Sequence, residues 1–202
     1  MNLSSRLLLG AGLSWAAVLI LHDMGLLTLG ARSRENRHNA TCQSNLKQLG
    51  FALLQYTQDY GEFPAVPGNT ARFGWVETLR PYLNVQPPDQ SVLQCPAEAN
   101  SWQRNPKSRN YTDYWFNAHL SRRNYTTVGE VSRLLIAGDG NDGSDLTDGR
   151  YSLSMLPYKW VSHEASPLYS HLGRANYLFA DGHAKALNLR AFLLNGAAPS
   201  PS

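Results

Sequence analysis

The chain is poor in cysteine and in net charge. Its 202 residues include only Cys42 and Cys95, and 18 Lys and Arg side chains against 15 Asp and Glu give a formal net charge of +3. Two thiols exclude a disulfide-rich scaffold and a four-cysteine metal site, but they allow one disulfide. A dense Lys/Arg cluster and a zinc-finger spacing are both missing, so we expect no nucleic-acid partner.

The sequence also lacks the common catalytic motifs. It contains no G-x-S-x-G, P-loop, H-E-x-x-H or G-x-G-x-x-G pattern. We therefore predict no catalytic residues and expect a protein that is not an enzyme. The 43% hydrophobic and 10% aromatic content is typical of a folded protein with a substantial core.

The most distinctive stretch is a long apolar run near the start. Leu7–Leu21 carry no charge, His22 and Asp23 interrupt the run, and Met24–Ala31 resume it. The whole stretch is long enough to cross a membrane as a helix.

Three interpretations of residues 1–31 stay open. They form a membrane-spanning helix, a cleaved secretory signal with Arg6 at its basic start and small residues near Ala31, or a helix packed among copies of itself. All three place the rest of the chain at or beyond a membrane.

Side chains of this helix are the predicted assembly contacts. Because an unpaired buried charge is costly, we expect His22 and Asp23 to pair with each other or with polar groups of neighbours. The predicted contacts are Leu7, Trp15, Leu19, His22, Asp23 and Leu26.

Residues 32–60 read as an amphipathic continuation of the same helix. Spacings of three and four residues separate the members of one stripe, which are Cys42, Leu46, Leu49, Leu53, Tyr56 and Tyr60. Proline is absent from Arg32 to Asp59, so one rod from about Ser5 to Tyr60 is predicted, roughly 80 Å long.

Residues 61–202 are predicted to form a globular, β-rich domain. Gly61 and Pro64 end the rod, a short helix is expected near 74–83, and Val131–Ala137 reads as a buried strand. Near the C-terminus, Asp181-Gly182 lies between two apolar runs, which is a strong hairpin signal. The predicted fold class is α+β.

These landmarks resemble a bacterial pseudopilin-like family. The run Cys42–Gly50, Trp75, Cys95-Pro96 and the spacing His171, nine residues, Asp181-Gly182 are similar to prepilin-type proteins with an H-X9-DG carboxy-terminal motif, also classed as a domain of unknown function. The likeness covers about residues 32–188. It implies a pilin-like long N-terminal helix packed on a small antiparallel sheet, as in type IV pilins and the pseudopilins of type II secretion.

One position departs from the pilin pattern. Arg6 and Ala11 stand where a prepilin peptidase site would have Gly and Glu. The resemblance therefore does not imply that this N-terminus is processed.

We predict a disulfide between Cys42 and Cys95. Cys42 lies on the stripe that should face the globular domain, Cys95 precedes a proline in a loop, and outside the cytoplasm a bridge between them is reasonable. The chain-entropy estimate for a loop of this length is about 4 kcal/mol. The alternative is two separately buried thiols.

His171, Asp181 and His183 have two interpretations. They are ligands of a metal ion, or Asp181 is a turn residue while His171 pins the preceding loop against the hairpin by hydrogen bonding. The second interpretation is favoured.

An acidic, glycine-rich loop is a candidate calcium site. Oxygen ligands on a flexible loop suit calcium, and major pseudopilins of type II secretion are similar in having a calcium-stabilised loop. An ordinary solvated turn is the alternative, and calcium is the one cofactor considered. The candidate ligands are Asp139, Asn141, Asp142, Asp145 and Asp148.

Together these features predict a structural subunit of a pilus-like or pseudopilus filament, or a pseudopilin anchored in the inner membrane with a periplasmic domain. Its expected partners are copies of itself, the membrane, and secretion or pilus machinery. The alternative is a monomeric binding module of the cell envelope, either tethered to the membrane or secreted. Binding by this module could depend on calcium. Processing and polymerisation stay open.

Overall fold

A computed structural model describes residues 3–66, 73–83, 91–98, 111–144 and 147–194, with side chains of the first helix described from residue 28 onward. The chain divides into two compact units, Met1–Arg37 and His38–Ser202. Everything that follows about packing concerns the second unit.

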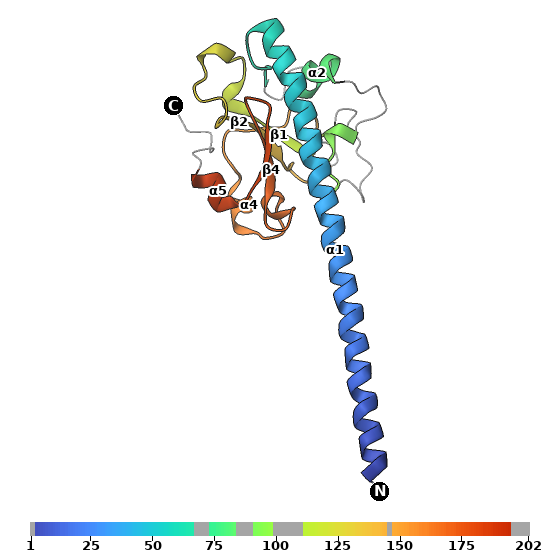
Figure 1. Ribbon diagram of the computed structural model, residues 1–202. Helices are drawn as coiled ribbons and strands as arrows, with labels where there is room; N and C mark the ends of the chain where they lie inside the picture. The colour runs from blue at the N-terminus through green and yellow to red at the C-terminus, as the bar shows by residue number, and fades with distance from the viewer. Residues whose placement is uncertain (1–2, 67–72, 84–90, 99–110, 145–146, 195–202) are drawn as a thin grey trace. The chain divides into compact units, whose positions relative to one another are not determined.

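The first helix, α1, is continuous from Leu3 to Tyr60 (Figure 1), which confirms the predicted long N-terminal helix. It ends where Gly61 adopts a left-handed backbone with φ of 72° and its N–H donates to the Thr57 carbonyl at 2.9 Å. Glycine is favoured at that position because a Cβ would crowd the left-handed conformation.

Within the described residues, no helical stretch combines the length and apolarity that a membrane span requires. The side chains of the predicted assembly contacts lie outside those residues: Leu7, Trp15, Leu19, His22, Asp23 and Leu26.

The apolar stripe of α1 is buried along most of its predicted length. Cys42, Leu46, Leu49 and Leu53 are at most 1% exposed, and Tyr56 is 8% exposed. The prediction was wrong for Tyr60, which is 64% exposed. It is the last residue of the helix, and its ring stacks on Tyr56 with centroids 4.5 Å apart rather than entering the core.

Several shorter helical segments lie between the strands and after α1. The α-helices are α2 (Trp75–Leu79), α4 (Tyr158–Ser162) and α5 (Leu189–Leu194). The 3₁₀ turns are η1 (Arg80–Tyr82), η2 (Ser91–Leu93), η3 (Ala118–Leu120), η4 (Tyr125–Thr127) and η5 (Pro167–Tyr169). Helix α2 and turn η1 together cover the predicted helix near 74–83.

Five strands of the described residues form one sheet in the order β3-β1-β2-β4-β5. The strands are β1 (Tyr114–Asn117), β2 (Leu135–Asp139), β3 (Ser152–Leu153), β4 (Ala175–Phe179) and β5 (Ala184–Leu187). All neighbours are antiparallel except β3, which runs parallel to β1. The α+β fold class is confirmed, with this parallel edge as the exception to an antiparallel sheet.

The predicted strand at 131–137 begins later than expected. The N–H groups of Arg133 and Leu134 donate to the Glu130 carbonyl, which makes a turn, and β2 starts at Leu135. An apolar run without alternation does not by itself fix where a strand begins.

The C-terminal hairpin is confirmed. Strands β4 and β5 flank Asp181-Gly182, Gly182 has φ of 87°, and its N–H donates to the Phe179 carbonyl at 2.9 Å. The Phe179 N–H in turn donates to the His183 carbonyl at 2.9 Å.

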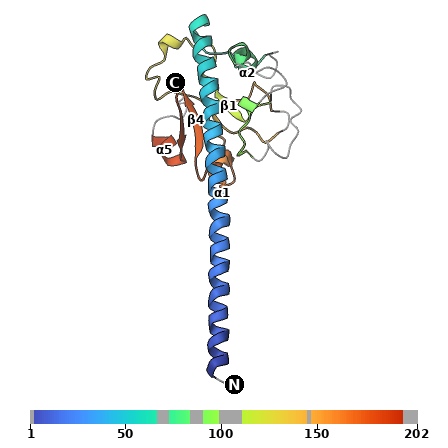
Figure 2. The same ribbon diagram turned by 45° about the vertical axis from the view of Figure 1, so that its right-hand side comes forward.

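The sheet is covered on both faces. Tyr114, Ile136 and Leu178 pack with the α1 stripe in one core, whereas Trp115 and Tyr177 pack with α4 and α5 residues in a second. Adjacent residues of one strand enter different cores because strand side chains alternate. Figures 1 and 2 both show the C-terminal part of α1 running beside strands β1 and β4.

Candidate functional site

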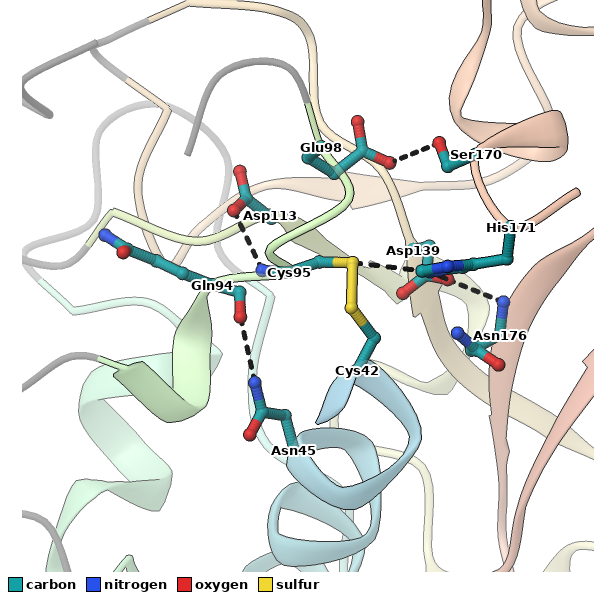
Figure 3. The surroundings of a disulfide bond; sticks show 10 residues. All are labelled: Cys42, Asn45, Gln94, Cys95, Glu98, Asp113, Asp139, Ser170, His171 and Asn176. Carbon is teal, nitrogen blue, oxygen red and sulfur yellow. Dashed lines mark hydrogen bonds and ion pairs between the residues drawn. A yellow bond between two sulfur atoms is a disulfide. The ribbon is translucent and has the colours of Figure 1, made fainter. Parts of the chain in front are cut away.

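The predicted disulfide is present and fully buried. Cys42 of α1 and Cys95, in the segment after η2, are bonded with their Cα atoms 5.1 Å apart, and both are 0% exposed (Figure 3). Asn45, one turn further along α1, donates from Nδ2 to the Gln94 carbonyl at 2.8 Å. The helix therefore holds the Cys95 segment by a covalent bond and a hydrogen bond.

His171 lies directly beside the disulfide. Its Nε2 is 3.4 Å from Sγ of Cys95 and 3.2 Å from Oδ2 of Asp139, and the His171 side chain is 1% exposed. A tight turn places it: the His171 N–H donates to the Arg174 carbonyl at 2.9 Å, one residue before β4. Figure 3 shows the imidazole pointing toward the Cys95 sulfur, with the Asp139 carboxylate beside the tip of the ring.

Asp139, the last residue of β2, is 0% exposed. Its Oδ2 accepts from the backbone N–H of Asn176 at 2.6 Å, while its Oδ1 has no hydrogen-bond partner among the described residues. Buried polar atoms usually have a partner, because desolvating one without a replacement costs about 1–3 kcal/mol. Oδ1 of Asp139 is one of several buried polar atoms without a partner in the described part of the chain, and it is the one that belongs to a carboxylate.

Asp113, just before β1, approaches the disulfide from another side. Its Oδ2 accepts from the Cys95 N–H at 3.0 Å, and its Oδ1 accepts from the Tyr111 hydroxyl at 2.8 Å and from Asn141 Nδ2 at 2.9 Å. Burial raises the pKa of Asp113 to about 7, although the Tyr111 and Cys95 hydrogen bonds act in the opposite direction.

Glu98 is the third buried carboxyl of the cluster. It is 7% exposed, and its Oε1 accepts from the Ser170 hydroxyl at 2.9 Å. Burial raises its pKa to about 8, and the nearby charge of Asp139 adds to the effect. Three acidic side chains thus lie around one disulfide in the interior.

Residues 32–154 match the family model described as "Protein of unknown function (DUF1559)". The match covers more than half of the chain. The chain belongs to the DUF1559 family. No curated protein and no solved structure matched the chain.

The DUF1559 match begins at Arg32, where the resemblance seen in the sequence also begins, and it includes both cysteines, Asp113 and Asp139. The H-X9-DG spacing lies beyond its end. In the structure that spacing has a simple cause: the nine residues consist of a turn followed by β4 and Ala180, so His171 and Asp181-Gly182 lie at opposite ends of one strand.

The three residues considered as metal ligands in this DUF1559 protein do not come together. His171 is buried at one end of β4, whereas Asp181 and His183 are at the other end, with Nδ1 of His183 2.5 Å from Oδ1 of Asp181. Asp181 also accepts from the His183 N–H at 3.1 Å, as a turn residue does. The His171 side chain contacts Asp139 at the end of β2 and the disulfide, whereas it was expected to pin the preceding loop against the hairpin.

The described members of the candidate calcium set have separate protein partners. Asp139 faces His171, and Asn141 binds Tyr111 and Asp113. Asp142 accepts from the Ser144 N–H at 2.9 Å and from the Thr147 hydroxyl. Asp148 pairs with Arg150 at 2.6 Å, and Asp145 lies outside the described residues.

Among the described residues, a different set of side chains is close enough to share a metal ion. Sγ of Cys42, Sγ of Cys95, a carboxylate oxygen of Asp139 and a ring nitrogen of His171 all lie within 4.8 Å of one another. Every residue of this set was singled out in the sequence, but their meeting was not predicted. One feature of the sequence pointed toward this cluster: both cysteines and His171 are among the residues that carry the resemblance to a single family.

A cavity of about 400 Å³ opens beside Glu98. Its lining includes Asp142 from the acidic loop and Lys159, Trp160 and His163 from α4 and the residue after it. The cavity therefore combines groups that carry positive and negative charge with one large aromatic side chain.

Proposed function

We propose that this DUF1559 protein is a structural subunit of a pilus-like or pseudopilus filament, or an inner-membrane-anchored pseudopilin. Residues 1–31 form the anchoring or filament-core part, and the globular domain lies outside the cytoplasm. Copies of the chain, the membrane, and secretion or pilus machinery are the proposed partners.

The observation that carries this proposal is the double attachment of α1 to β4. At one end of the strand, Cys42 of α1 meets His171 through the Cys95 sulfur. At the other end, Gly50 of α1 lies against Gly182 of the hairpin turn. The two attachment points are eight residues apart on the helix, or about 12 Å. Helix and sheet are therefore joined at two separated points, which is compatible with a globular domain held firmly on a long helix.

The buried disulfide supports the proposed location. Disulfides persist in oxidising compartments and are rare where thioredoxin and glutathione keep thiols reduced. A bridge that closes a loop across 53 residues of the chain stabilises a domain by about 4 kcal/mol in the chain-entropy treatment. Such a contribution suits a domain that works outside the cytoplasm.

Negative-stain microscopy of material purified from its native source, combined with N-terminal sequencing, tests the proposal. Filaments, or detergent-dependent particles, that carry this chain with residues 1–31 attached are expected. A full-length chain that stays a dispersed monomer in buffer without detergent would contradict it, because an apolar helix of this length needs lipid or copies of itself.

The cavity beside Glu98 favours a second candidate, an envelope binding module. A pocket of this size with a few polar groups and an aromatic wall is typical of small-molecule sites. Filaments that carry this chain would exclude the monomeric binding module, and free monomers that need no detergent would exclude the anchored or filament-forming subunit.

A further inference from the structure

We propose that reduction of the Cys42–Cys95 disulfide converts its surroundings into a binding site for one zinc ion. The ligands are the two cysteine sulfurs, Nε2 of His171 and a carboxylate oxygen of Asp139. This inference is independent of the filament proposal, because it concerns only the interior of the globular unit.

The geometry of the four side chains is the first argument. A tetrahedral zinc ion holds sulfur at about 2.3 Å and nitrogen or oxygen at about 2.0–2.2 Å, so its ligand atoms lie roughly 3.3–3.8 Å from one another. Nε2 of His171 is already 3.4 Å from the Cys95 sulfur and 3.2 Å from Oδ2 of Asp139. The two sulfurs, which a covalent bond holds together, have to separate, and the Asp139 carboxylate has to present Oδ1 to the ion. These are short movements, because the four ligand groups start within 4.8 Å of one another.

The second argument is the unsatisfied carboxylate. Oδ1 of Asp139 is buried and accepts no hydrogen bond from the described residues, so it is available to a cation. Oδ2 is meanwhile fixed by the Asn176 N–H at 2.6 Å. Outer hydrogen bonds of this kind orient metal ligands and raise affinity.

The donor set selects the metal. Two thiolates and an imidazole suit zinc, whereas calcium and magnesium take mostly oxygen ligands. All four side chains come from the protein and all four residues are at most 3% exposed. A site closed by four protein ligands is typical of structural zinc rather than catalytic zinc.

The conversion requires a dithiol reductant. One thiolate of the reductant attacks a sulfur of the Cys42–Cys95 bond and forms a mixed disulfide, and its second thiol displaces that sulfur. The reductant is oxidised to a disulfide, and two electrons and two protons arrive on the cysteines. Zinc then binds both thiolates and releases the two protons. Because the cluster is buried, both steps need local opening and are expected to be slow.

In the zinc form, the metal would join α1 to the Cys95 segment, as the covalent bond does, and would add the end of β2 and the turn before β4. Cys42 belongs to α1, Asp139 ends β2, and His171 precedes β4. The attachment of the helix to the sheet would then persist in either redox state.

Metal retention by the full-length chain tests the proposal. The protein is reduced with dithiothreitol, desalted without oxygen, mixed with one equivalent of zinc, and passed through gel filtration before elemental analysis. About one zinc per reduced chain is expected, with none retained by the oxidised chain. Cobalt in place of zinc should give thiolate-to-cobalt charge-transfer bands and the strong visible bands of tetrahedral coordination.

Two variants and one control define the ligands. His171→Ala and Asp139→Ala should each weaken zinc binding by the reduced protein at least tenfold. His183→Ala removes an exposed histidine directly after the motif and should leave affinity unchanged.

Three results would overturn the proposal. The first is equal zinc retention by the reduced and oxidised wild-type chains, and the second is a cobalt spectrum without thiolate bands. The third is a folded His171→Ala chain that binds zinc as tightly as wild type. If that variant does not fold, two measurements on the wild-type chain replace it: the cobalt spectrum, and the melting temperature of the reduced chain with and without zinc. A spectrum without thiolate bands, or a melting temperature that zinc does not raise, would reject the site.

Discussion

Gly50 of α1 lies against Gly182 of the β4-β5 turn. A Cβ on Gly50 would come within 3.0 Å of the Gly182 carbonyl oxygen and 2.8 Å of Cδ1 of Leu178. On the other side, a Cβ on Gly182 would come within 2.8 Å of Cδ1 of Leu54. Two landmarks of the sequence, the glycine that ends Cys42–Gly50 and the glycine of H-X9-DG, are thus in contact.

The Gly50→Ala variant should be less stable than wild type by about 1–2 kcal/mol. Alanine favours a helix over glycine by about 1 kcal/mol, but here the added methyl meets a backbone oxygen that cannot move without disturbing the hairpin. Thermal unfolding of the full-length chain, followed by circular dichroism, measures the difference.

Gly30→Ala is the matched control in the same helix. Nothing lies within 4 Å of a Cβ at this position, so its stability should be unchanged or slightly higher. A Gly50→Ala variant that is as stable as Gly30→Ala would show that the helix and the turn are not in tight contact.

Loss of the disulfide should reduce the free energy of unfolding by about 4 kcal/mol. Cys42→Ala, Cys95→Ala and the double variant should lose similar amounts, because each removes the same bond. Urea denaturation of the four proteins measures this. Losses that add in the double variant, or two free thiols in the denatured and unreduced wild-type chain, would contradict the bond.

Glu98 should make stability depend on pH. Its pKa is raised in the folded protein, to about 8, so between the unfolded pKa near 4.3 and 8 the folded state binds one proton more than the unfolded state. The free energy of unfolding therefore falls as pH rises through this range.

The Glu98→Gln variant removes that titration. It should match wild type near pH 4 and be more stable than wild type at pH 8.5 by roughly 1–3 kcal/mol. Denaturation at both pH values gives the comparison. An identical pH dependence for both proteins would show that Glu98 is not the group responsible.

Asp23→Ala should alter assembly, since a charge inside an apolar helix has to be paired when the helix is buried. Fewer or irregular filaments by negative stain, or a changed oligomer size in detergent, are expected. Glu130→Ala is the control: it removes an exposed carboxylate whose pair with Arg133 is on the surface and contributes little. Normal filaments from Asp23→Ala would argue against the role of this residue.

Local patterns predicted the elements well. The three- and four-residue spacing of apolar side chains gave α1, and Asp181-Gly182 between apolar runs gave the hairpin, because both depend on neighbours in sequence. The prediction failed where an end is set by the fold: Tyr60 was expected in the core but closes the helix in solvent, and β2 starts four residues late.

The surroundings of the disulfide were only partly predictable. The Cys42–Cys95 pair could be chosen because just two cysteines exist. The positions of His171 and Asp139 beside it could not, because they depend on the order β1-β2-β4 in the sheet. In the acidic loop, closeness in sequence did not become closeness in space. Five oxygen-bearing residues near one another in the chain suggested a calcium site, but those that the structure describes bind separate partners.

The sequence by itself determined where the long helix lies, because the periodicity of its side chains is a local property. It also determined where the hairpin turns, through Asp181-Gly182, and that one disulfide was available, because the chain has two cysteines. Only the tertiary structure decided that the helix runs along β4 and meets it at both ends, through Cys95 and His171 at one and Gly50 and Gly182 at the other. Such contacts depend on burial and strand order, which bring together residues more than a hundred positions apart.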